Sequence, residues 1–371
     1  MSWRAVSCVW LLITFAIVDI CRAAKMEHSR RDNNTDTITI VVPAFFSDPP
    51  QLGLSITTIL QLQIWRTLRK EPERNPDRLS FGNGQALWDS ATLEEPTNEA
   101  AVIEAADSAQ MVVWGKAYAL GSGSSVMTYL TVPTIKDSRL VKFEQWKLTF
   151  KVSNEKFDVI ADLPTRQYAF EPIFLPESLV SAYSSLDALT IYKTRTGRKK
   201  LGVVASASEL FALRWEENSV RVRTNRVTGW LRIPQLSNTT EVVDFVGGLM
   251  RIFRADWEGA LELLSRVTTN PQTPTALRID ANLLAARATY QLGGNFEPYL
   301  LEAEKYDRFS QRIIRYRVMG MLAELNNSDA GPLVERAAAA REYLDARAHL
   351  FPADDEWLVA CRQLLDALTK R

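Results

Sequence analysis

The spacing of hydrophobic and polar positions from residue 37 to residue 130 changes repeatedly between a strand period and a helix period. Residues 39–43 form a β-branched run that predicts a buried strand, and proline ends it. A helix is predicted next, because apolar residues recur at steps of three and four from Ile56 to Leu68. The remaining segments are a weak edge strand at 79–87, an alanine-rich helix at 101–109, and strands at 111–114 and 126–130 joined across 121–125. This order predicts a small mixed sheet with helices on one face.

The same order resembles the N-terminal domain of TolB and its relatives. In that family an opening strand ends in proline, and an alanine-rich helix followed by a V-x-G strand brings the last hairpin into the sheet. Here Ile38 to Pro43 and Met111 to Lys116 occupy those places. The resemblance covers about residues 37 to 155 and implies an α/β domain that binds other proteins.

Residues 140 to 185 continue in extended segments and are expected to complete this domain. Residues 146–152 alternate apolar and polar side chains, as a half-buried strand does. Residues 168–176 also read as extended, because their two prolines exclude a helix.

Five short strands separated by polar turns are predicted between residues 186 and 236. Strands this close together predict a small β-barrel. The segment resembles bacterial SH3-like domains, which typically end with a strand, a polar turn, a Gly-Trp-aliphatic sequence and a closing turn. Thr228 to Leu231, followed by the chain to Leu236, fits that place.

From Thr240 the apolar period becomes helical. A helix, a tight turn at Asp256 and Trp257, a second helix and Pro271 resemble one tetratricopeptide (TPR) unit. A second unit is predicted from Thr275, although its turn at 296–298 departs from the pattern. The later helices, at 309–324 and 331–348, lose the signature, and a helix at 354–367 is expected to be an end cap.

These segments together predict an α+β multidomain protein with a small mixed α/β sheet domain, an SH3-like β-barrel and an all-α TPR-like region. The predicted boundaries are a signal peptide at 1–23, a polar lead-in at 24–36, the TolB-like domain with its extension at 37–185, the barrel at 186–236 and the helical region at 237–371.

The first residues predict export to the periplasm. Arg4 precedes an apolar run over residues 5–18, and small residues near Ala23 offer a cleavage point. The run is shorter than the ~20 residues that a spanning helix needs, so cleavage is favoured over an uncleaved membrane anchor. Lipid attachment at Cys21 is a third alternative, which the residues before Cys21 disfavour. Cleavage would leave Cys361 as the last cysteine, without an intramolecular disulfide and expected to be buried.

Composition and motifs give no support for catalysis. Lys plus Arg and Asp plus Glu both total 44, so the chain has no net positive charge that would attract nucleic acid. The sequence has two histidines, His28 and His349, and His28 lies in the polar lead-in, which nearly excludes a histidine-dependent triad or a multi-histidine metal site. The sequence has no G-x-S-x-G, P-loop or G-x-G-x-x-G motif. No catalytic residue, cofactor or metal is therefore predicted.

The candidate partner-binding residues lie in the predicted barrel. They are Tyr192, Trp215, Trp230, Arg198, Lys199 and Lys200. In SH3-like folds such aromatic side chains can line a peptide groove, because rigid aromatics bind extended ligands at low entropic cost. The alternative is that they close the barrel core. The basic turn is either simply exposed or a contact for peptidoglycan or an acidic partner.

These observations predict an exported, non-enzymatic adaptor or scaffold that mediates protein–protein interactions in the bacterial cell envelope. Its partners would be other envelope proteins, with no nucleic acid, and with membrane contact only through an uncleaved signal segment. The alternative is a peptidoglycan-associated structural or sensory component that binds the cell wall through the barrel. A hydrolase with an unrecognised site has no supporting residue.

Overall fold

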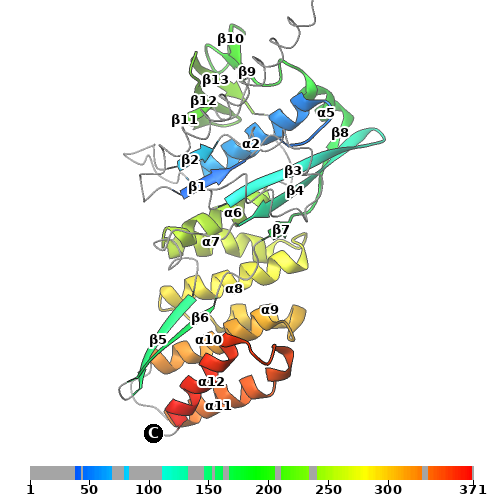
Figure 1. Ribbon diagram of the computed structural model, residues 1–371. Coiled ribbons are helices and arrows are strands. Elements are labelled where there is room, and N and C mark those ends of the chain that lie inside the picture. The colour runs from blue at the N-terminus through cyan, green and yellow to red at the C-terminus, as the bar shows by residue number, and fades with distance from the viewer. Residues whose placement is uncertain are drawn as a thin grey trace, which may run out of the picture. The chain divides into compact units, whose positions relative to one another are not determined.

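The structure is a computed structural model that has a mixed α+β fold (Figure 1). It describes residues 38–42, 45–68, 79–82, 111–132, 146–152, 155–161, 167–204, 210–233, 240–327 and 333–369. The chain divides into two compact units. The first contains Met1–Pro133 and Phe174–Leu236, and the second contains Thr134–Ile173 and Ser237–Arg371. The predicted signal peptide and lead-in lie outside the described residues.

A mixed sheet forms the first part of unit 1. The strands of this sheet that belong to unit 1 are β1 (Ile38–Val41), β2 (Leu79–Gly82), β3 (Met111–Leu120), β4 (Gly123–Thr131) and β8 (Ile173–Pro176). β1 pairs in parallel with both β2 and β3, β3 pairs antiparallel with β4, and β8 pairs with β4. Gly121 turns the chain between β3 and β4 at φ +50°, a conformation that glycine adopts without strain. The predicted strands are confirmed, the one at 79–87 only over residues 79–82, and the remainder of that segment and the alanine-rich helix at 101–109 lie outside the described residues.

Two helices accompany this sheet, α2 (Pro50–Leu68) and α5 (Glu177–Ser184). α2 confirms the helix predicted from the apolar spacing and contacts α5. Its polar residues are also buried and make specific hydrogen bonds. The Ser55 hydroxyl donates to the Tyr183 carbonyl at 2.8 Å, and the Thr57 hydroxyl accepts from the Phe45 amide at 2.9 Å. These bonds fix α2 along its buried length.

The second part of unit 1 is a five-stranded antiparallel sheet. Its strands are β9 (Thr190–Tyr192), β10 (Lys200–Val203), β11 (Phe211–Glu216), β12 (Ser219–Arg223) and β13 (Thr228–Arg232). All five predicted strands are confirmed, in the order β10-β9-β13-β12-β11. A closed barrel needs its two outer strands to pair. Over the described residues β10 and β11 do not pair, so the region is an antiparallel sheet and the expected closed barrel is not found there.

Unit 2 is built on seven helices in the part of the chain that the structure describes. They are α6 (Thr240–Phe253), α7 (Trp257–Thr269), α8 (Thr275–Gln291), α9 (Glu297–Asp307), α10 (Gln311–Asn327), α11 (Leu333–Asp345) and α12 (Glu356–Thr369). Consecutive helices contact one another along the series. The Asp256 carboxylate accepts from the Gly259 amide at 3.0 Å and caps α7 at the predicted tight turn. The predicted helices are confirmed, whereas their membership of the TPR family stays a prediction.

A two-stranded hairpin also belongs to unit 2. It consists of β5 (Trp146–Val152) and β6 (Glu155–Ala161), and both strands contact α10 and α12. Trp146 is fully buried, with ring centroids 5.4 Å from Tyr290 and 5.5 Å from Tyr316. A lone hairpin cannot bury its apolar face by itself. The structure therefore groups residues 146–161 with the helices, and not with the α/β domain that was expected to extend to residue 185.

Unit 1 and unit 2 contain no helix that is long and apolar enough to cross a membrane, within the residues that the structure describes. Cys361 is buried in α12, as expected, and is a free cysteine.

Candidate functional site

A row of five side chains crosses the whole antiparallel sheet of unit 1. Residues directly opposite each other on paired strands project from the same face. Lys200 on β10 lies opposite Tyr192 on β9, which lies opposite Trp230 on β13. Trp230 lies opposite Arg221 on β12, which lies opposite Arg214 on β11. These five residues are called the cross-strand row below.

The other face of this sheet is apolar. Ile191, Val220 and Leu231 are sequence neighbours of the row residues and are fully buried. Successive side chains on a strand point to opposite faces, so the sheet has one face packed into unit 1 and one face with the row. Trp215 lies opposite Val220 and therefore belongs to the apolar face. The guanidinium of Arg66 on α2 lies 5.0 Å from its ring centroid.

Arginine side chains lie over aromatic rings on the face of the cross-strand row. The Arg232 guanidinium lies 4.6 Å from the Tyr192 ring centroid and donates to the backbone carbonyls of Arg195 and Gly197 at 3.3 and 3.0 Å. One strand further along, the Arg223 guanidinium lies 5.4 Å from the ring of Phe211, which is 44% exposed. Cation–π contacts of this kind orient the guanidinium groups in advance of a ligand.

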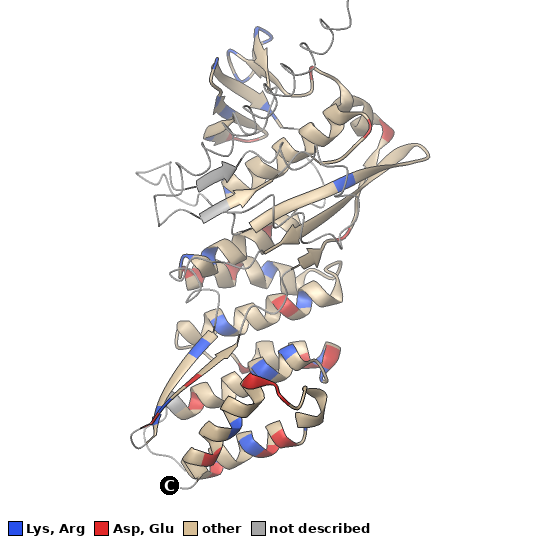
Figure 2. Cartoon of the chain, in the orientation of Figure 1, with Lys and Arg blue, Asp and Glu red and all other residues tan. Residues whose placement is uncertain are grey.

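The charges on this face are only partly neutralised. The Lys200 ammonium is 2.6 Å from the Asp187 carboxylate, which raises the pKa of Lys200, and Arg214 is 2.9 Å from Glu216. Arg221 is exposed and has no carboxylate within ion-pair distance among the described residues. Figure 2 shows basic positions on several strands and turns of this sheet. The face is therefore aromatic at its centre and basic around it.

The predicted site residues fall into three groups. Tyr192, Trp230 and Lys200 belong to the cross-strand row, and Trp215 belongs to the opposite face. Arg198 and Lys199 are exposed in the turn before β10, where the Lys199 carbonyl accepts from the Lys193 amide at 2.9 Å.

Sequence reasoning missed Arg214 and Arg221. The alternation of arginine with valine in residues 219–223 indicated that Arg221 faces away from the core. It could not show that Trp230 lies beside it, since register depends on pairing with β13.

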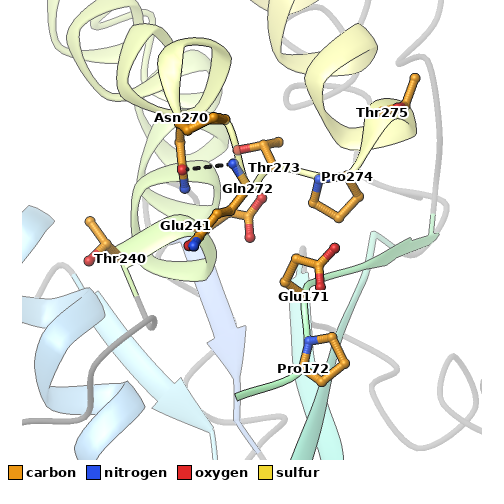
Figure 3. A pocket seen from close by; sticks show the side chains of 10 residues that line it. Glu171, Pro172, Thr240, Glu241, Asn270, Gln272, Thr273, Pro274 and Thr275 are labelled. Carbon is orange, nitrogen blue, oxygen red and sulfur yellow. Dashed lines mark hydrogen bonds between the residues drawn. The ribbon is translucent and has the colours of Figure 1, made fainter. Parts of the chain in front are cut away.

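A second candidate site is a pocket of about 710 Å³ in unit 2, shown in Figure 3. The start of α6, the turn between α7 and α8, and the segment after β7 (Gln167–Ala169) form it. Its lining is polar with proline between the polar groups: Glu171, Pro172, Thr240, Glu241, Asn270, Pro271, Gln272, Thr273, Pro274 and Thr275.

Hydrogen bonds from Arg278 stabilise the turn that forms one side of the pocket. The guanidinium donates to the carbonyls of Asn270 and Thr273 at 2.8 and 3.1 Å, and to the Tyr306 hydroxyl at 3.1 Å. The Thr273 hydroxyl, which is buried, donates to the Val267 carbonyl at 2.9 Å. These hydrogen bonds within the protein therefore hold the pocket wall in place before any ligand binds.

Glu241 is the buried acid of this pocket. Its side chain is 7% exposed, and its Oε1 atom has no hydrogen-bond partner within the described structure. Burial raises the pKa of Glu241, and the negative charge of Glu171 raises it further. Polar interactions with Thr273 and with the backbone at Glu171, and the positive charge of Arg278, lower the pKa and so act in the opposite direction. The carboxylate therefore lacks a full set of compensating partners.

Over the described residues, no group of three or more His, Cys, Asp and Glu side chains is placed to hold a metal ion. The first site is aromatic and basic, and the second is acidic. No family model, no curated protein and no solved structure matches this chain.

Proposed function

We propose that this chain is an exported, non-enzymatic adaptor or scaffold for protein–protein interactions in the bacterial cell envelope. In this proposal the antiparallel sheet is an SH3-like module that binds one partner, and the helices are a TPR-like region that binds another. The sequence pattern of residues 37 to 155 resembles the N-terminal domain of TolB and its relatives, and this resemblance supports an envelope role.

The observation that supports this proposal most directly is the cross-strand row. Tyr192 and Trp230 place two rigid aromatic side chains together at the centre of a sheet face, and such residues dominate the binding energy of protein interfaces. Arg221 and Arg214 continue the row as charged groups that can pair with carboxylates of a partner. An extended, acidic segment of a partner protein fits this combination.

The test is affinity capture from an envelope extract with the full chain as bait. The doubly substituted chain Trp230→Ala/Arg221→Ala removes the centre of the row. We expect it to bind partners at least about 30-fold more weakly than the wild type, since interface Trp and Arg side chains each contribute about 1 kcal/mol or more. Arg226→Ala is the matched control, because Arg226 is an exposed arginine of the turn between β12 and β13. Equal retention by the row variant and the control would contradict the proposal.

A second candidate function is attachment to peptidoglycan through the same face. The specific observation that favours it is the pairing of aromatic rings with unneutralised arginine, which suits an anionic glycan-peptide polymer as well as an acidic protein. Co-sedimentation with purified sacculi separates the two candidates. Peptidoglycan binding requires the wild type and Arg226→Ala to sediment with sacculi and the row variant to stay in the supernatant. The protein-adaptor proposal expects no co-sedimentation of any of them.

A further inference from the structure

The pocket at the start of the helical unit contains an acid whose position the fold alone does not explain. Glu241 is the second residue of α6, where a carboxylate commonly offsets the partial positive charge of a helix N-terminus. An acid in that role is normally solvated, because the interaction is weak. Glu241 is instead buried, with Oε1 lacking a partner in the described residues, and it lines a pocket of about 710 Å³.

The electrostatics of the pocket select a cationic ligand. A buried carboxylate with one oxygen that lacks a hydrogen-bond partner is unfavourable. Glu171 lines the same pocket and adds a second negative charge, which acts unfavourably on Glu241. Figure 3 shows both glutamates at the hollow between the turn and the segment that carries Glu171. A ligand with a positive head would pair with Glu241 and relieve the repulsion between the two acids.

The walls of the pocket point to an organic cation and away from a metal ion. Three prolines, Pro172, Pro271 and Pro274, contribute apolar rings beside the acids. Long basic side chains combine an apolar stem with a charged head, so their stems pack on such surfaces. A divalent ion requires more oxygen ligands than two carboxylates supply, and no group of three or more His, Cys, Asp and Glu side chains is placed to hold a metal ion among the described residues.

We propose that this pocket binds the cationic side chain of an arginine or lysine residue presented by a partner protein. The head group would lie against Glu241 and Glu171, and the aliphatic stem would lie on the prolines. The inference extends the proposed adaptor role by giving the helical unit a binding site of its own. The pocket belongs to unit 2 and the cross-strand row belongs to unit 1. A substitution in the pocket therefore tests this inference and leaves the cross-strand row intact.

The experiment titrates the full chain with capped amino acids and follows backbone amide signals by NMR. The probes are N-acetyl-arginine amide and N-acetyl-lysine amide, and the matched probe is N-acetyl-citrulline amide, which has the shape of arginine without its charge. We expect saturable shifts with a cationic probe at signals from residues 240–241 and 270–275. Citrulline should produce shifts at least about tenfold weaker at the same concentration, since a charged hydrogen bond is lost.

Two variants make the result specific to this pocket. Glu241→Gln and Glu171→Gln should each lower the affinity for the cationic probes, the former by about tenfold or more. Glu258→Gln, an exposed acid on α7 outside the pocket, removes the same charge and should bind as the wild type does. Thermal unfolding confirms that each variant is folded, and Glu171→Gln changes only an exposed residue. Equal binding of citrulline and arginine, no saturable binding by the wild type, or unchanged affinity in both pocket variants would overturn the proposal.

Discussion

Tyr192 and Trp230 lie directly opposite each other on β9 and β13. Their strands come from segments almost 40 residues apart in sequence, and the pair occupies the middle of the cross-strand row. The residue before Trp230 makes this pairing possible. A Cβ atom on Gly229 would lie 2.5 Å from the Tyr192 carbonyl oxygen and 2.7 Å from Cγ2 of Ile191. The Gly-Trp doublet thus combines a close approach of two strands with an aromatic side chain on the outer face.

The first prediction concerns that close approach. Gly229→Ala should lower the free energy of unfolding of unit 1 by about 1–3 kcal/mol, because overpacking against backbone forces β9 and β13 apart. Gly202→Ala is the matched control in the same sheet, since its Cβ would meet only Val227 Cγ2 at 3.7 Å. The control should be neutral or slightly stabilising. Denaturant unfolding followed by tryptophan fluorescence measures both, and equal destabilisation by the two substitutions would be inconsistent with the register described here.

The second prediction concerns pH and Asp244 on α6. Burial raises the pKa of Asp244 from 3.8 to about 6, against the opposing attraction of Arg266, whose Nη1 lies 3.6 Å from Oδ1. The folded state therefore binds this proton more tightly than the unfolded state does. It follows that the contribution of Asp244 to stability is present below about pH 4 and is lost as pH rises through about 6.

Asp244→Asn should consequently stabilise the protein by about 1–2 kcal/mol at pH 7.5 and have little effect at pH 4. Replacement by asparagine removes the buried charge, although it also removes the attraction to Arg266. Unfolding free energies of the wild type and the variant between pH 4 and pH 8 provide the measurement. The unfolding free energy of the control variant Glu258→Gln should depend on pH as that of the wild type does across this range. A variant that is less stable than the wild type at pH 7.5 would show that the ion pair with Arg266 outweighs the effect of burial.

The third prediction tests the assignment of the β5–β6 hairpin to the helical unit. Trp146→Ala removes a fully buried ring that contacts Tyr290 of α8 and Tyr316 of α10. We expect the free energy of unfolding of unit 2 to fall by about 3–5 kcal/mol. Val359→Ala on α12 is the control, because Val359 is 42% exposed and its truncation should change stability by less than about 0.5 kcal/mol. Loss of far-ultraviolet helical signal on heating reports unit 2. An unchanged helical transition in Trp146→Ala would mean that the hairpin does not contribute to this core.

The fourth prediction concerns Cys361. Burial raises the pKa of this thiol well above its ordinary value, so the reactive thiolate is scarce in the folded protein. In a chain with Cys8 and Cys21 replaced by serine, alkylation by iodoacetamide at pH 8 should be at least about 100-fold slower in buffer than in guanidinium chloride. Mass spectrometry over a time course measures the two rates. Rapid labelling of the native chain would indicate that α12 opens readily.

The local pattern of the sequence was sufficient for most of the elements. Apolar steps of three and four predicted the helices of unit 2, and β-branched runs between polar turns predicted the five strands of the antiparallel sheet. α5 was missed, because Pro176 directly before it and the extended residues upstream gave no helical period. The helix and strand periods depend on residues that are only a few positions apart in the chain. For this reason a single sequence is sufficient to predict them.

The sequence by itself determined most of the elements, the aromatic and basic character of residues 189–232, and the scarcity of histidine. Only the tertiary structure decided that Trp230 faces outward beside Tyr192 while Trp215 faces inward, because a shift of one residue in register exchanges the two faces of a strand. It likewise decided that residues 146–161 pack with the helices, and that Glu171 and Glu241 share one pocket. Each of these outcomes depends on pairing between segments far apart in the chain, which local hydrophobic spacing does not encode.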